Sequence, residues 1–513
     1  MTTTGPRTDR ETLDALELAE FGYAQQLHRR LGSFASFAAG FSFVSILTTV
    51  FQLFAFGFSF GGPAFFWTWP LVFAGQLFVA LTFAELASRY PISGCVYQWS
   101  RRLSNGVTGW FAGWLMLLGQ IVSVAAAAIA LQVVLPSIWA GFQIVPGGSA
   151  LTSTSGATNA VLLGSVLITL TTVINAVGVR VMALVNSVGV ACELVGVALL
   201  AVLLIAAAER GPGVVTDTGG AAEGGGYLGA FLASALMAAY VMYGFDSAGE
   251  LAEETRNPRR TAPRAILRAL FVSAAGGALL LLGGLMAAPS LTDGRLAAEG
   301  LAYVLTEALG TGLGKLLLAD VAVAVFICTL AIQTAASRLM FSMARDRVLP
   351  GSARLARVSE RTGAPMLPAA LIGVLAVAML LVNVGNAQIF TAVTGASVVI
   401  VYLAYLLVTL PGLVARARGR LGAAAPGGFS LGRWGLPVNA VAVLYGLAMA
   451  VNIAWPRSAV YDPDGGDPYL RWFPVLAVSA ALLSGLLVYA LRRRRPVELP
   501  VPVTPAPVEG SPS

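Results

Sequence analysis

Residues 103–179 read LSNGVTGWFAGWLMLLGQIVSVAAAAIALQVVLPSIWAGFQIVPGGSALTSTSGATNAVLLGSVLITLTTVINAVGV. These 77 residues contain no Asp, Glu, Lys or Arg. A helix that crosses a bilayer needs about 20 apolar residues, so this run has room for two spans and the turn between them. The stretch therefore predicts an integral membrane protein.

The rest of the chain repeats this pattern. Charge-free runs of 54 residues cover 31–84 and 362–415, and each again has room for two spans. Only 11% of the 513 residues are charged, against roughly 25% in a typical soluble domain. The prediction is an all-α polytopic membrane protein with twelve transmembrane helices. The single spans are expected within 181–208, 224–245, 269–292, 313–337, 434–456 and 472–491.

The basic residues predict how the chain is oriented. On this topology, 27 of the 32 Lys and Arg lie on one side of the membrane. By the positive-inside rule that side is the cytoplasm, which places both termini there, most simply in a plasma-membrane protein. The net charge of +7 then reflects orientation and does not indicate nucleic-acid binding. The loops concerned lie within 1–30, 87–108, 179–182, 250–268, 338–366, 412–436 and 492–513.

Several classes of chemistry are excluded by what the chain lacks. Its three cysteines, Cys95, Cys192 and Cys328, are too far apart for a metal motif or a disulfide framework. His28 is the only histidine, so zinc sites, haem ligation and histidine-based hydrolysis are not expected. No phosphate-binding loop is present. We therefore expect neither an enzyme nor a bound metal or cofactor.

Two spans are poor candidates for plain lipid-facing helices. In the first, roughly 34–58, residues 40–49 read GFSFVSILTT, and such clustered hydroxyl groups can compensate an unwound turn. The alternative is a small-residue packing face. In the sixth, roughly 228–249, residues 239–250 read AYVMYGFDSAGE. A glycine lies there between two aromatic residues, and Asp246 follows this triplet directly. An ionisable group within a span faces the bundle interior, unless Asp246 merely ends the helix at the interface.

Interrupted spans at corresponding positions of two halves are typical of inverted-repeat transporters. Three motifs point the same way: RYPISGCVY at 89–97 after Glu85, GFD at 244–246 followed by EETRNPRRTAPR at 253–264, and SRLMFSMARDRVLP at 337–350. In this order and at these spans, the chain resembles the amino acid–polyamine–organocation permeases over nearly its whole length.

A subgroup of that family is also indicated. The EET form at 253–255 and the pattern of Trp110, Trp114, Gly119 and Gln120 in the third span are similar to the amino acid/choline transporter branch. That branch is similar to permeases for amino acids, 4-aminobutyrate and choline. The resemblance implies a secondary-active transporter that lies in the lipid bilayer. It would move a small-molecule substrate across the membrane by alternating access.

The resemblance also implies a division of the chain. Spans 1–5 (31–208) and spans 6–10 (228–410) would form a five-plus-five inverted repeat, followed by spans 11–12 (434–491). Residues 1–30 form a cytoplasmic segment, and the proline-rich residues 492–513 form a disordered tail.

The substrate site is expected between the broken parts of spans 1 and 6. Exposed N–H groups at a half-helix N-terminus suit a carboxylate, and carbonyl groups suit an ammonium. By resemblance, Tyr240 carries the aromatic ring that covers the substrate. The expected binding residues are Ser45, Ile46, Leu47, Thr48, Thr49, Gln120, Tyr240, Tyr243, Gly244, Phe245 and Asp246.

Charged residues of the cytoplasmic loops are expected to close the inner side in one conformation, the alternative being that they only anchor the topology. These gate residues are Arg89, Glu253, Glu254, Arg338, Arg345 and Asp346.

Glu193 is the candidate for proton coupling. It lies mid-span among apolar neighbours, where a carboxyl group favours its neutral form and can take up and release a proton. By resemblance, some family members place an ionisable Lys here. The alternatives are a structural hydrogen bond for Glu193 and, for the protein, sodium coupling or exchange. A transporter-like nutrient sensor is less expected, since the tail has only 22 residues.

Overall fold

A computed structural model describes residues 18–221, 226–382, 384, 389–421, 428–463, 465–466 and 468–493. The disordered tail predicted at 492–513 lies almost wholly outside these residues, as do residues 1–17 of the N-terminal segment.

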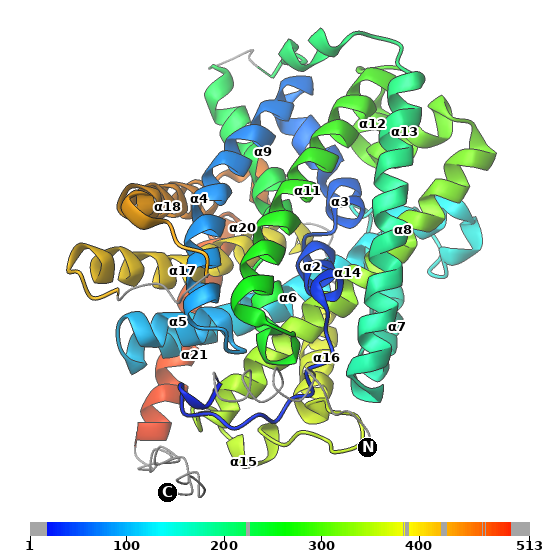
Figure 1. The fold of residues 1–513 in the computed structure, drawn as a ribbon. Helices are drawn as coiled ribbons and strands as arrows, with labels where there is room; N and C mark the ends of the chain where they lie inside the picture. The colour runs from blue at the N-terminus through cyan, green and yellow to red at the C-terminus, as the bar shows by residue number, and fades with distance from the viewer. Residues whose placement is uncertain are drawn as a thin grey trace, which may run out of the picture.

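The described chain is helical, apart from one isolated β-bridge between Leu31 and Thr255 (Figure 1). The long helices are α2 (Ser33–Val44), α3 (Ile46–Gly61), α4 (Thr68–Arg89), α6 (Gly106–Ile138), α7 (Thr154–Val177), α8 (Val179–Ala206), α9 (Tyr227–Val241), α11 (Pro258–Ala287), α14 (Thr311–Arg345), α16 (Met366–Leu381), α17 (Ile389–Ala417), α18 (Gly435–Ala454) and α21 (Phe473–Arg493). The short ones are α5 (Cys95–Leu103), α10 (Ser247–Glu250), α12 (Gly294–Glu299), α13 (Leu301–Ala308), α15 (Ser352–Leu355), α19 (Ser458–Tyr461) and α20 (Pro468–Arg471).

Ten of the described helical segments are long and apolar enough to cross a membrane. The helices α9 and α16 are apolar but shorter, and both lie where spans are expected. The all-α polytopic fold is thus confirmed, while the number of twelve spans stays a prediction.

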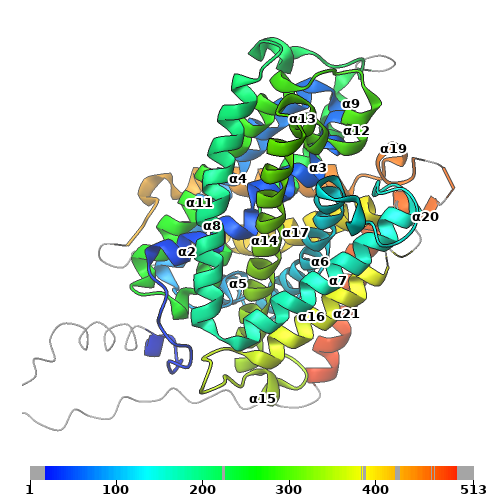
Figure 2. The same cartoon turned by 90° about the vertical axis from the view of Figure 1, so that its right-hand side faces the viewer.

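Small residues let the helices approach one another closely at the centre of the bundle. The helix α6 packs against α14 and α17 (Figure 2). A Cβ added at Gly119 of α6 would lie 2.7 Å from Val401 Cγ2 on α17, and one at Gly189 of α8 would lie 2.2 Å from Ile327 Cγ1 on α14. Packing of this kind, rather than the hydrophobic effect, holds helices together where the surrounding solvent is itself apolar.

Helices five predicted spans apart also pack in pairs. The helix α3 lies on α9, α4 on α11, α6 on α14, and α7 on α16. Each pair joins an element of 31–208 to one of 228–410, so the two predicted repeats interleave and do not form separate lobes.

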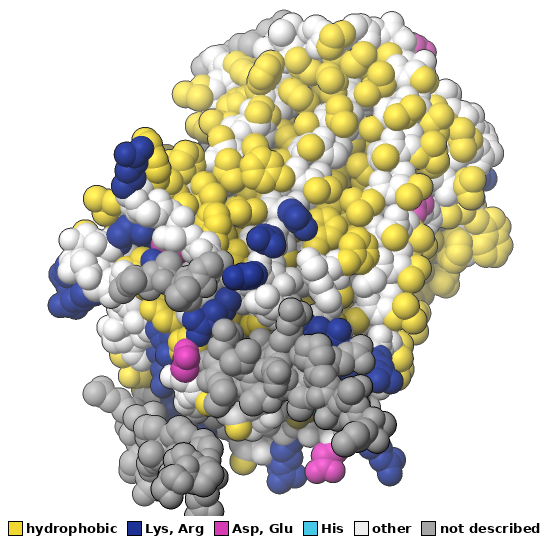
Figure 3. All heavy atoms as spheres, in the orientation of Figure 1, with side chains coloured by type: hydrophobic (Ala, Val, Ile, Leu, Met, Phe, Trp, Pro, Cys, Tyr) yellow, Lys and Arg dark blue, Asp and Glu magenta, His cyan; other side chains and the backbone are white. Residues whose placement is uncertain are grey.

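The outer surface divides into an apolar belt and a basic end (Figure 3). Leucine and valine side chains of the outer helices face outward, such as Val195 on α8, which is 67% exposed. We use "basic end" for the end of the bundle formed by residues 18–31, α5, α10, α15 and the last turn of α14. Both ends of the described chain lie there (Figure 1).

Candidate functional site

Both predicted breaks occur in the structure. The helix α2 ends at Val44 and α3 begins at Ile46, with Ser45 at φ +35° between them. The helix α9 ends at Val241 and α10 begins at Ser247, with Gly244 at φ +90°. A right-handed α-helix requires a negative φ at every residue, so neither position continues a regular helix.

The first break is confined to one residue. The sequence predicts an interruption near Ser45–Thr49, and only Ser45 departs from helical geometry, since residues from Ile46 onward are helical. The hydroxyl groups explain why the break is so short: Ser45 Oγ lies 2.7 Å from Thr48 Oγ1, and Thr49 Oγ1 donates to Ser45 O at 2.7 Å. Local hydrogen bonds of this kind satisfy the backbone polar groups at the break, so the helix can resume after a single residue.

The two breaks face each other. A Cβ at Gly244 would lie 1.8 Å from the Phe43 ring, so the chain needs glycine there for space as well as for its φ angle. The rings of Phe43 and Tyr243 lie 6.1 Å apart between centroids, edge to face. Gly40 packs on the carbonyl oxygen of Phe245.

Glu193 is buried at the first break. Its Oε1 accepts hydrogen bonds from Ser45 Oγ at 2.9 Å and from the Leu47 N–H at 3.2 Å, while Oε2 has no partner among the described residues. The first turn of a helix has unpaired N–H groups and a partial positive charge, and a carboxylate satisfies both. Glu193 therefore occupies the helix N-terminus that the sequence had suggested for a substrate carboxylate.

A second acid lies close to Glu193. Asp320 of α14 packs against Gly196, where an added Cβ would lie 1.7 Å from its Oδ2. Gly196 is almost one turn along α8 from Glu193. No local pattern in the sequence signals this proximity.

Asp246 is fully buried at the second break. Its Oδ1 accepts a short hydrogen bond from the Tyr405 hydroxyl, which itself accepts one from the Gly244 N–H at 2.9 Å. In the part of the chain that the structure describes, Oδ2 has no partner. Tyr405 lies in the charge-free stretch of α17, and sequence reasoning missed it because nothing near it marks it. Within the described residues neither Asp246 nor Glu193 forms an ion pair.

Aromatic and amide groups complete the surroundings. Tyr243 and Ser123 share a hydrogen bond of 2.8 Å, and Tyr240 packs edge to face on Tyr243 at 5.8 Å between ring centroids. Gln120, one turn from Ser123, is buried with both amide atoms unpartnered. A buried amide without partners is unfavourable by about 1–3 kcal/mol, so Gln120 and the two acids can gain from a polar ligand.

The predicted gate residues lie at the basic end, in more than one cluster. Arg345 binds Glu253 through two bonds of 2.7 Å, and Arg338 binds Glu254 at 2.9 Å, with both acids fully buried. The loop after α4 joins them, since the Ser93 N–H donates to Glu253 Oε1 at 3.1 Å.

The other two predicted gate residues, Arg89 and Asp346, form ion pairs outside this set. Arg89 and Arg416 both bind the Glu85 carboxylate, Arg89 at 2.8 Å and Arg416 at 2.5 Å. Asp346 pairs with Arg101 of α5 and accepts from the Tyr97 hydroxyl at 2.8 Å.

The N-terminal segment lies across this closed end, which the sequence did not suggest. The N–H groups of Arg30 and Leu31 both donate to Glu254 O at 2.9 Å. The Tyr23 hydroxyl donates to Asp346 Oδ1 at 2.8 Å, and the Arg345 guanidinium lies 3.9 Å from the Tyr23 ring centroid. Burial and the adjacent Asp346 carboxylate raise the pKa of Tyr23, so its hydroxyl remains a donor at neutral pH.

Known proteins are similar to this chain over most of its length. A family model described as "Amino acid permease" matches residues 31–482. Amino-acid permease BAT1 of Arabidopsis thaliana is 27% identical over 462 residues, which cover 86% of this chain and 88% of that protein. Its homolog in Oryza sativa subsp. japonica is 28% identical over 499 residues, 93% of each chain. Amino-acid permease 2 of Neurospora crassa is 26% identical over 467 residues, 87% of this chain and 82% of that protein.

Proposed function

The chain belongs to the amino acid permease family, a group of membrane transporters, and on that premise we propose that it carries an amino acid or a small amine by alternating access. The substrates that fit best are those with an ammonium group, of the 4-aminobutyrate or choline type. The site lies between the breaks at Ser45 and at Tyr243–Asp246.

The observation that carries this proposal is the environment of Asp246. A fully buried carboxylate with one unpartnered oxygen and no ion-pair partner is unfavourable until a cation neutralises it. The neighbouring rings of Phe43 and Tyr243 attract an ammonium through cation–π interaction, and Tyr240 covers the substrate from the far side. Gln120 supplies hydrogen bonds to the rest of the substrate.

The alternating-access part rests on the packing of the helices. Residues 31–208 and 228–410 act as inverted repeats, which the pairing of helices five spans apart supports, and residues 434–491 add the last two spans. The basic end faces the cytoplasm of the plasma membrane, and its ion pairs close the site on that side.

Proton coupling through Glu193 completes the proposal. Its unpartnered oxygen and the lack of an ion pair allow the carboxyl group to be neutral in one conformation and charged in another. Sodium coupling and exchange are the alternatives, and the driving gradient distinguishes them from proton symport.

The test is uptake of labelled amines and amino acids by the full chain in proteoliposomes, with a proton gradient, a sodium gradient or neither. Asp246→Asn should lower uptake of an ammonium substrate roughly tenfold or more, because a charge-assisted bond is lost. Glu299→Gln, which removes an exposed carboxylate, is the matched control. Unchanged uptake in Asp246→Asn would exclude Asp246 from the site.

A further inference from the structure

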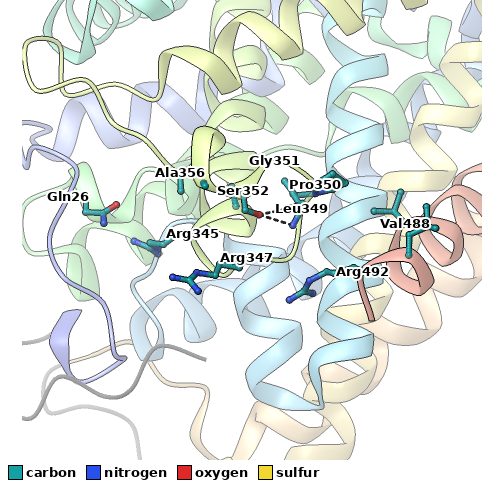
Figure 4. Close-up of a pocket in the computed structure, with 13 residues that line it drawn as sticks. Gln26, Arg345, Arg347, Leu349, Pro350, Gly351, Ser352, Ala356, Val488 and Arg492 are labelled. Atoms are coloured by element: carbon teal, nitrogen blue, oxygen red, sulfur yellow. Dashed lines mark hydrogen bonds between the residues drawn. The ribbon is translucent and has the colours of Figure 1, made fainter. Parts of the chain in front are cut away.

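A cavity of about 850 Å³ opens at the basic end, away from the substrate site (Figure 4). Its wall is built by the end of α14, the following turn, α15, α21 and Gln26 of the N-terminal segment. Three arginines from separate elements line it: Arg345, Arg347 and Arg492. None of the described lining residues is Asp or Glu. A volume of this size is typical of small-molecule sites.

Two of these three positive charges are not matched within the described chain. Both terminal nitrogens of Arg345 bind Glu253, so its charge is compensated. Arg347 and Arg492 have no ion pair among the described residues, and Arg492 Nε is buried without a partner. The nearest carboxylate in sequence, Asp346, is already bonded to Arg101, Tyr97 and Tyr23.

The backbone at Arg347 gives independent support. The Arg347 N–H bonds to Ala344 O at 2.8 Å and the Val348 N–H to Met343 O at 3.0 Å, which is the helix-ending motif that favours glycine. Arg347 adopts φ +56° there, so a strained arginine occupies a position at which glycine would be unstrained. Strain of this kind persists where the side chain has a use.

The apolar part of the wall continues onto the outer surface of the bundle. Val488 and Leu491 line the cavity, and α21 is one of the candidate membrane spans. Leu483, Leu487 and Leu491, one turn apart along α21, are 65%, 61% and 59% exposed. The cavity therefore lies where an apolar stripe ends in basic residues, which is the depth at which lipid headgroups lie.

We propose that this cavity binds the phosphate group of an anionic phospholipid. Arg347 and Arg492 hold the phosphate oxygens, and the acyl chains follow the leucine stripe of α21. Arginine suits this task because its planar guanidinium donates two parallel hydrogen bonds to phosphate. The same chemistry would accept a soluble phosphate ester, but such a ligand makes no use of the stripe.

The test measures binding to the purified full-length chain by thermal unfolding. The probes are dioctanoyl phosphatidylglycerol, dioctanoyl phosphatidylcholine and glycerol 3-phosphate at equal concentrations. We expect only phosphatidylglycerol to raise the unfolding temperature clearly. The double variant Arg347→Gln with Arg492→Gln should weaken its apparent affinity about tenfold or more. Arg354→Gln on α15, which removes an exposed arginine outside the cavity wall, should not.

Arg347→Gly separates binding from structure. Glycine relieves the strain at φ +56°, so this variant should unfold at a higher temperature without lipid and yet gain less from phosphatidylglycerol. An equal shift with phosphatidylcholine, an equal shift with glycerol 3-phosphate, or a lipid response retained in the double variant would each overturn the proposal.

Discussion

At the residue scale, the two oxygens of Glu193 have different surroundings. One holds Ser45 and the first turn of α3, whereas the other has no partner. The first arrangement is the structural role that the sequence left open, and the second is what proton coupling requires. The two roles are compatible in one side chain, since protonation of the free oxygen leaves the bonds to the other in place.

Glu193→Gln separates them. The amide oxygen of Gln still accepts from Ser45 and Leu47, so the variant should fold and exchange substrate normally. Because it cannot release a proton, accumulation driven by a pH gradient in proteoliposomes should vanish. Glu193→Ala is the comparison: it removes the cap of α3 and should lower the free energy of unfolding by about 1 kcal/mol. A Gln variant that accumulates substrate with unchanged pH dependence would rule out the coupling role.

At the element scale, residues 18–31 act on the gate from outside the bundle. The segment bonds to the turn after α10 through Leu31 and to the end of α14 through Tyr23. Its backbone and side-chain donors bond directly to the carbonyl oxygens of Glu253 and Glu254, two of the predicted gate residues. If the gate works as proposed, these bonds should hold the basic end in the arrangement described.

Tyr23→Ala removes a hydrogen bond to a carboxylate and the contact with Arg345, so the basic end should open more often, by roughly tenfold. Cys95 is a native reporter, since it is fully buried beneath the gate beside Gly249. In a Cys192→Ser background, its labelling by a maleimide should accelerate in Tyr23→Ala and less in Tyr23→Phe, which keeps the ring. Equal labelling rates in all three proteins would show that the segment does not hold the gate.

At the scale of the whole molecule, the basic residues and the apolar belt predict one orientation in the membrane. The loop after α11 lies at the opposite end from α15 (Figure 2). On the face drawn in Figure 3, Lys and Arg side chains gather toward the basic end, and moving such charges across a bilayer is strongly unfavourable.

Introduced cysteines test this orientation in intact cells, again with the exposed Cys192 replaced by Ser, so that only the buried Cys95 and Cys328 remain beside the new thiol. A membrane-impermeant maleimide should label Thr292→Cys, an exposed position after α11, from outside. It should label Glu360→Cys, an exposed position near α15, only after the cells are permeabilised. The reverse pattern would place the basic end outside the cell and invalidate the assignment of the gate.

Much of the fold was predictable from short segments. The first span was expected at 34–58 and its two helices occupy Ser33–Gly61, while the sixth was expected at 228–249 and occupies Tyr227–Val241 with Ser247–Glu250. The first break lies where hydroxyl groups interrupt an apolar run. The second lies where a glycine between two aromatic residues precedes an acid. The length of the first break could not be predicted, because hydrogen bonds between neighbouring side chains decide where a helix resumes.

The sequence by itself determined the apolar spans and the two interrupted helices, because partition into lipid and backbone conformation depend on residues close together in the chain. Only the tertiary structure decided what those helices bring together. Ser45 meets Glu193 across 148 positions, and Tyr405 meets Asp246 across 159. Such contacts depend on how helices rotate and pack against one another. That packing is set by many small side chains at once. No local pattern could therefore predict the cap of α3, the partner of Asp246 or the arginine-lined cavity.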